Sequence, residues 1–209
     1  MKRSFTYLTF FFAISSFTYG QSADTLKNKT SKAAEINVSA INTQLLSGKF
    51  YGINWNIKYF PTKRFATGAF IVFSQKKISD TFSFSIEKPI IYYYEIGWAN
   101  QFDLLKTDRT QINISLVNAL SVSRLGDNAH KERIHKNSAK EIATNYFYAF
   151  EPGGGFGIKL FSAGQNGDIW LTAETNYRFV AGKSKYAATK QFSGYLFSLG
   201  ISVIGFPDN

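Results

Sequence analysis

The sequence repeats one pattern that restricts its fold: runs of about ten residues or more in which apolar and small polar residues alternate. In residues 90–102, IIYYYEIGWANQF, the even positions carry isoleucine, tyrosine, tryptophan and phenylalanine, interrupted by Asn100. The odd positions are mostly small or polar and include Glu95, with Ile91 as the main exception. Because side chains alternate across a strand, this pattern predicts an extended segment with one apolar face. The pattern recurs in residues 51–59, 111–122, 169–179 and 195–203.

The apolar face is predicted to contact lipid rather than a protein core. Runs of this length match a tilted strand that crosses a bilayer. A soluble β-sandwich also alternates, but its outward face is charged. Here the polar face is mainly glycine, serine, asparagine and threonine, and aromatic residues such as Tyr51, Tyr59 and Trp98 occur toward the ends of the apolar face. Aromatic residues at both ends are typical of the two lipid–water interfaces.

The first twenty residues have the features of a secretory signal peptide. Lys2 and Arg3 precede a short apolar run, and a small residue at position 20 suits cleavage near Gly20–Gln21. The run is too short, and too interrupted by serine and threonine, to serve as a transmembrane helix. We therefore expect export of the mature chain, with residues 21–34 as a linker. The sequence has no cysteine, which excludes disulfides and thiolate chemistry.

The formal net charge is +10, so a polyanionic partner is expected. For an exported protein, lipid phosphates at a membrane surface are more accessible than nucleic acid. The composition therefore favours a membrane lipid partner and no nucleic acid.

Counting the alternating segments predicts an all-β fold, an eight-stranded antiparallel up-and-down transmembrane β-barrel over residues 35–206 with a tail at 207–209. An even number of strands closes the sheet and leaves no unpaired edge in lipid. Three connections are short, and three others are longer and more charged, as expected for periplasmic turns and external loops. The connection near Ser47–Lys49 is a short exception on the external side. The expected strands are about 35–45, 49–60, 64–75, 89–103, 110–123, 145–161, 168–181 and 192–206; the short connections are 61–64, 104–109 and 162–168, and the long ones are 76–88, 124–144 and 182–191.

Four segments carry a family resemblance: YFPTKR between two strands, EPGGGFGIKL, AETNYRF and the closing SGYLFSLGISVIGF. Together with the signal peptide, they resemble the small bacterial outer-membrane β-barrel family (OmpA/OmpX/OmpW-like) across residues 35–206. The resemblance implies an outer-membrane location and a monomer. Such barrels commonly end on an aromatic residue that is used for assembly. Here Phe206 is followed by Pro207-Asp208-Asn209 and has the opposite parity to Tyr195 and Val203.

Six charged residues lie on the small, polar face of the predicted strands and are therefore expected to point into the barrel interior. The interior of an eight-stranded barrel is just wide enough to be filled by side chains, so buried charges there must be paired. We expect a structural charge network of three bases and three acids rather than a conducting pore: Lys58, Glu95, Glu151, Lys159, Glu174 and Arg178.

Two other features suggest chemistry only weakly. Residues 152–159, PGGGFGIK, lack the spacing of a phosphate-binding loop. The histidines His130 and His135 lie near Ser138 in a charged segment with Glu132 and Glu141, where a lipid-modifying hydrolase or acyltransferase could place its catalytic groups. Two histidines are too few for a convincing metal site, and no cofactor or metal is expected.

We therefore expect a non-enzymatic outer-membrane protein with a structural or surface-interaction role. Its basic external loops would contact lipopolysaccharide or a protein partner. Two alternatives stay open: an outer-membrane lipid-modifying enzyme, and a barrel subunit of a conjugation or secretion complex in the envelope. The surface-binding candidates are Arg124, Lys131, Arg133, Lys136, Lys183, Lys185 and Lys190.

Overall fold

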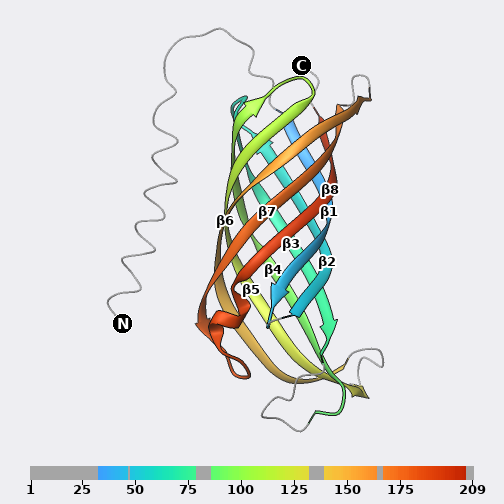
Figure 1. Ribbon diagram of the computed structural model, residues 1–209, viewed down its shortest axis with the longest axis vertical. Coiled ribbons are helices and arrows are strands. Elements are labelled where there is room, and N and C mark those ends of the chain that lie inside the picture. Colours follow the sequence, from blue (N-terminus) through green and yellow to red (C-terminus); the bar gives the residue numbers. More distant parts are fainter. Residues whose placement is uncertain (1–32, 47, 79–85, 132–138, 164–166, 206–209) are drawn as a thin grey trace, which may run out of the picture.

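The computed structural model describes residues 33–205, apart from 47, 79–85, 132–138 and 164–166. In this part of the chain, eight antiparallel strands pair in sequence order, and the last pairs with the first to close a barrel (Figure 1). The predicted fold class is therefore confirmed. The elements are β1 (Ala33–Leu45), β2 (Gly48–Phe60), β3 (Phe65–Lys77), β4 (Pro89–Lys106), β5 (Thr110–Lys131), β6 (Ala139–Ser162), β7 (Asp168–Lys183), the 3-10 helix η2 (Thr189–Phe192) and β8 (Gly194–Gly205).

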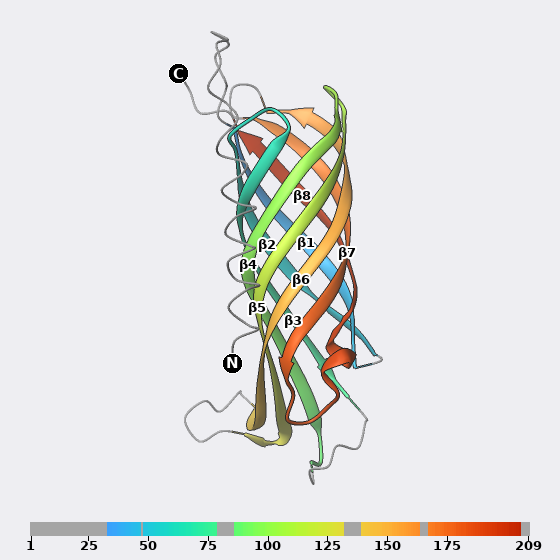
Figure 2. The ribbon, with the colours of Figure 1, turned by 90° about the vertical axis from the view of Figure 1, so that its left-hand side faces the viewer.

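The two ends of the barrel differ in their connections. At one end, called the short-turn end, the chain enters β1, leaves β8 and makes the turns β2–β3, β4–β5 and β6–β7 (top of Figure 2). At the other, called the long-loop end, lie the connections after β1, β3, β5 and β7. The predicted signal peptide, Phe206 and the predicted tail lie outside the described residues, and β1 begins at Ala33, inside the predicted linker.

The alternation seen in the sequence separates an apolar outer wall from a mixed interior. Large apolar side chains on the outside stay exposed, including Trp55 at 63% and Trp98 at 52% of their full area. Such a belt around a closed barrel is the expected surface for contact with lipid. Polar side chains on this wall bond to each other: Trp98 Nε1 donates to Thr67 Oγ1 at 2.7 Å, and Thr67 Oγ1 donates to Asn100 Oδ1 at 2.8 Å. No helix in the described part of the chain has the length and hydropathy needed to cross a membrane.

Three apolar clusters fill the interior, and Val180 packs against two of them. One closes the short-turn end and includes Phe60 and Trp170. A second lies midway and includes Phe70. A third closes the long-loop end and includes Phe50 and Phe192. The barrel interior is therefore a packed core rather than an open channel.

The β5–β6 connection differs from the prediction. Residues 124–144 were expected to form a loop, but β5 continues to Lys131 and β6 begins at Ala139. Paired residues such as Arg124 and Thr144 extend the hairpin, with register shifts beyond Leu125. Backbone pairing does not require an apolar face, so two strands can stay paired beyond the point where the apolar–polar alternation ends. That is the case in this part of the hairpin. Residues 152–159 lie within β6, and not in a loop before a helix.

Candidate functional site

A buried guanidinium links several strands inside the barrel. Arg178 of β7 is completely buried, and its Nε lies 3.1 Å from Glu95 Oε2 of β4 and donates to Glu151 Oε1 of β6. Its Nη1 donates to Thr43 Oγ1 of β1 at 3.0 Å. The guanidinium also lies 4.7 Å from the ring centroid of Tyr93, whose hydroxyl donates to Glu95 Oε2 at 2.5 Å. β4 and β7 are not neighbours in the sheet, so this cluster bonds across the barrel.

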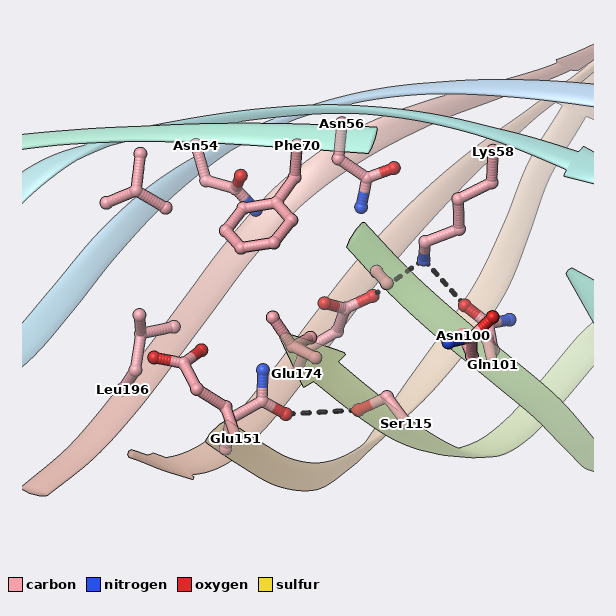
Figure 3. Close-up of a pocket in the computed structure, with 14 residues that line it drawn as sticks. Asn54, Asn56, Lys58, Phe70, Asn100, Gln101, Ser115, Glu151, Glu174 and Leu196 are labelled. Carbon is pink, nitrogen blue, oxygen red and sulfur yellow. Dashed lines mark hydrogen bonds and ion pairs between the residues drawn. The ribbon is translucent and has the colours of Figure 1, made fainter. Parts of the chain in front are cut away.

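A buried lysine makes a second cross-barrel contact. Lys58 Nζ of β2 donates to Gln101 Oε1 of β4 at 2.6 Å and lies 3.4 Å from Glu174 Oε1 of β7 (Figure 3). Beside it, a cavity of about 30 Å³ is lined by polar side chains that include Asn54 and Asn56. A cavity of this size has room for one or two water molecules, so it is not a substrate pocket.

The six predicted interior charges do not form one network. Five of them form the Arg178 and Lys58 clusters described above. Lys159 instead lies near the short-turn end, where its Nζ is 2.7 Å from Asp168 Oδ1. The predicted network therefore divides into three separate groups along the barrel.

Two interior carboxylates that lie within the predicted strands were not among the predicted interior charges. Glu35 is buried and accepts a hydrogen bond from Ser202 Oγ at 2.7 Å. Asp103 is buried, accepts from the amide of Gln111 at 2.6 Å, and lies 3.2 Å from Lys106 Nζ. Strand parity would have placed both inside, since each shares the face of neighbours that point inward. With these two added, interior acids outnumber interior bases, in contrast to the predicted balance of three and three.

The β7–β8 connection folds into the barrel at the long-loop end. Phe192 of η2 is completely buried, with its ring centroid 4.7 Å from that of Phe147 and 5.8 Å from that of Tyr186. The Tyr186 hydroxyl is 2.5 Å from Ser123 Oγ, and burial raises the pKa of Tyr186 to about 12. The aromatic residues of this connection are thus held inside, whereas Lys185, Lys190 and Lys183 at the end of β7 are exposed.

The surface-binding candidates occupy different environments. Lys183, Lys185 and Lys190 are exposed at the long-loop end, around the plugged mouth of the barrel. Arg124 is not in a loop; it lies on β5, with its Nε 3.0 Å from Glu141 Oε2 on β6. Lys131 ends β5, and its side chain is outside the described set.

Several residues of the hypothetical catalytic segment are also not described. Arg133, Lys136, His135, Ser138 and Glu132 fall outside the described residues, as does the side chain of His130. The idea of a catalytic group in this segment therefore stays a hypothesis from the sequence. Within the described residues, no group of three or more histidine, aspartate or glutamate side chains is arranged to hold a metal ion.

Comparison with known proteins shows the fold. No protein family model and no curated protein sequence matches this chain. Among solved structures, Neisserial surface protein A (NspA) is similar with 11% identity and a TM-score of 0.50, over 83% of this chain and 97% of that one. The attachment invasion locus protein Ail of Yersinia pestis, in complex with the heparin analogue sucrose octasulfate, gives 10% identity and a TM-score of 0.48, over 83% and 99% of the two chains. The N-terminal β-barrel domain of Pseudomonas aeruginosa OprF gives 14% identity and a TM-score of 0.43, over 84% and 99%. The likeness to NspA and the closed eight-stranded topology together show that this chain has the fold of the small outer-membrane β-barrels.

Proposed function

We propose that this protein is a non-enzymatic, monomeric barrel of the bacterial outer membrane with a structural or surface-interaction role. The observation that supports this proposal is the filled interior, with an apolar cluster at each end and one midway between them. A filled barrel has little room for transport or for a buried substrate, so its surfaces are where partners can bind.

The proposed orientation puts the long-loop end outside the cell. Outer-membrane barrels have short periplasmic turns and longer external loops. In this chain the turns between Phe60 and Phe65 and between Lys106 and Thr110 are short, and both lie at the short-turn end. The exposed Lys183, Lys185 and Lys190 would then face the outer leaflet, where lipopolysaccharide presents phosphate groups.

The proposed ligand of this rim is lipopolysaccharide phosphate. The three lysines have no ion-pair partner among the described residues, and each can contribute about 1 kcal/mol near an anionic membrane surface. Salt screens such contacts, because the Debye length is about 8 Å at physiological ionic strength. Arg124, which is paired with Glu141, is expected to contribute less.

Charge neutralisation tests the proposal. A Lys183→Gln/Lys185→Gln/Lys190→Gln variant should retain less lipopolysaccharide than the wild type when purified at low salt, and the difference should shrink as salt rises. The matched control is Lys63→Gln/Arg64→Gln, which removes two charges from the opposite end of the barrel and should retain lipopolysaccharide normally.

Equal retention by the triple variant and the wild type at low salt would contradict the proposal. The lysines would then act as solubilising charges, and a protein partner would become the better explanation. Copurification from native membranes, with lipids and proteins both identified, would separate that explanation from an isolated structural barrel.

A further inference from the structure

The short-turn end of the barrel contains an open basin that the proposed function does not use. Its volume is about 450 Å³, within the range of small-molecule sites. The floor is formed by inward-facing apolar side chains of the cluster that closes this end, namely Ala33, Phe60, Trp170 and Ile204. We call this space the short-turn basin. An apolar concave floor of this kind accommodates the apolar body of a ligand.

Four basic residues and two acidic ones, Asp108 and Asp168, line the same basin, and two of the bases already have partners. Lys106 lies 3.2 Å from Asp103 Oδ2 and 4.3 Å from the ring centroid of Phe60. Lys159 is paired with Asp168. These two bases are therefore held in place by contacts within the barrel.

Lys63 and Arg64 are different. Both come from the β2–β3 turn, both are exposed, and neither has an ion-pair partner among the described residues. The turn that carries them is fixed at two points, because the Asp103 backbone N–H donates to the Arg64 carbonyl at 2.7 Å and the Phe65 N–H donates to Thr62 Oγ1 at 3.1 Å. Two cations without an ion-pair partner among the described residues thus lie on an anchored turn beside an apolar floor.

A buried donor in the floor also lacks a partner. Trp170 is 4% exposed, and its indole Nε1 has no hydrogen-bond acceptor among the described residues. Buried polar groups in proteins are nearly always hydrogen-bonded, and leaving one unpaired is costly. The nitrogen itself is shielded from the basin, so a ligand in the basin would contact the Trp170 ring, and the N–H would respond to the change in its packing.

We propose that the short-turn basin binds a small organic anion, with a carboxylate or phosphate head joined to an apolar body. The apolar floor receives the body. Lys63 and Arg64 pair with the head, since hydrogen bonds between charged partners are the stronger ones. The Trp170 ring forms part of that floor, so its indole N–H reports on occupancy of the basin. In the orientation proposed above, the basin opens toward the periplasm, so the anion would be a soluble periplasmic molecule or the head of an anionic phospholipid.

The indole resonance of Trp170 gives a direct test. A Trp55→Phe/Trp98→Phe background leaves Trp170 as the single tryptophan, because the chain has three. In zwitterionic micelles, titration with phenyl phosphate should shift the Trp170 indole N–H resonance in a saturable way. Titration with the neutral analogue benzyl alcohol should give no saturable shift of that resonance. A parallel titration with short-chain phosphatidylglycerol separates a lipid head from a free anion, and saturation by either probe supports the proposal.

The variant Lys63→Ala/Arg64→Ala loses both cations that pair with the head, so it should bind phenyl phosphate about tenfold more weakly or worse. A tenfold change in affinity corresponds to about 1.4 kcal/mol. Heat-modifiable migration on gels checks that this variant is folded. The control Lys49→Ala/Lys77→Ala, which changes two exposed lysines of β2 and β3 at the other end, should bind as the starting protein does. The proposal is overturned if neither anion gives a saturable shift, if benzyl alcohol binds equally well, or if the folded Lys63/Arg64 variant binds with unchanged affinity.

Discussion

At the scale of single residues, Arg178 is the cation that pairs with two buried carboxylates. It faces both Glu95 and Glu151, and all three are buried. The variant Arg178→Met would leave two carboxylates without their cation. Breaking a buried pair in this way costs about 3–5 kcal/mol, so we expect a loss of this size in the free energy of unfolding. Denaturant titration in micelles, followed by tryptophan fluorescence, measures it.

The Lys58 pair provides the comparison at the same scale. The Glu174 side chain is 18% exposed, and Lys58 keeps its hydrogen bond to Gln101 when the glutamate is changed. The isosteric variant Glu174→Gln should therefore cost less, about 1–2 kcal/mol. If both variants unfold at the wild-type denaturant midpoint, these charges are solvated and the interior is wetter than the packing indicates.

At the scale of elements, η2 is predicted to hold the β7–β8 connection inside the barrel mouth. Phe192 is its buried anchor, and replacing a buried phenylalanine with alanine costs about 3–5 kcal/mol. In Phe192→Ala we expect the connection to leave the mouth, so that trypsin cleaves faster after Lys185 and Lys190. Mass spectrometry of timed digests measures both cleavages. Phe197→Ala is the matched control, since Phe197 faces outward on β8 at 54% exposure and its loss should leave the cleavage rates unchanged.

The strands were predictable from the sequence only where one face meets lipid. There, burial imposes the period of two, so the central parts of all eight strands were found. Around residues 124–144 the alternation disappears while the backbone pairing continues, and the extra strand length was missed. The burial of Tyr186 could not be predicted either, because the segment around it has no period to read. Phe192 has the inward parity of the predicted strand 192–206, and what was missed there is the 3-10 helix that carries it.

At the scale of the whole molecule, the interior contacts depend on how the closed sheet brings distant strands together. Parity predicted that Arg178 and Glu95 point inward, but it could not predict that they meet. They lie on β7 and β4, which are not paired, and their contact depends on the register of every ladder between them. The same reasoning applies to Lys58 and Glu174 on β2 and β7. The faces of the strands are thus local properties of the sequence, whereas the pairs inside the barrel are properties of its closure.

The three tryptophans test that closed architecture as a whole. Trp55 and Trp98 lie on the apolar outer wall, while Trp170 is buried in the floor of the short-turn basin. In bilayers containing brominated lipids, whose bromine atoms quench fluorescence on contact, single-tryptophan variants that keep Trp55 or Trp98 should be strongly quenched. The variant that keeps Trp170 should be quenched much less, because the barrel wall separates that ring from the acyl chains. The remaining tryptophans are replaced by phenylalanine, and heat-modifiable migration confirms folding. Equal quenching at all three positions, or none at Trp55 and Trp98, would show that the apolar wall does not face lipid.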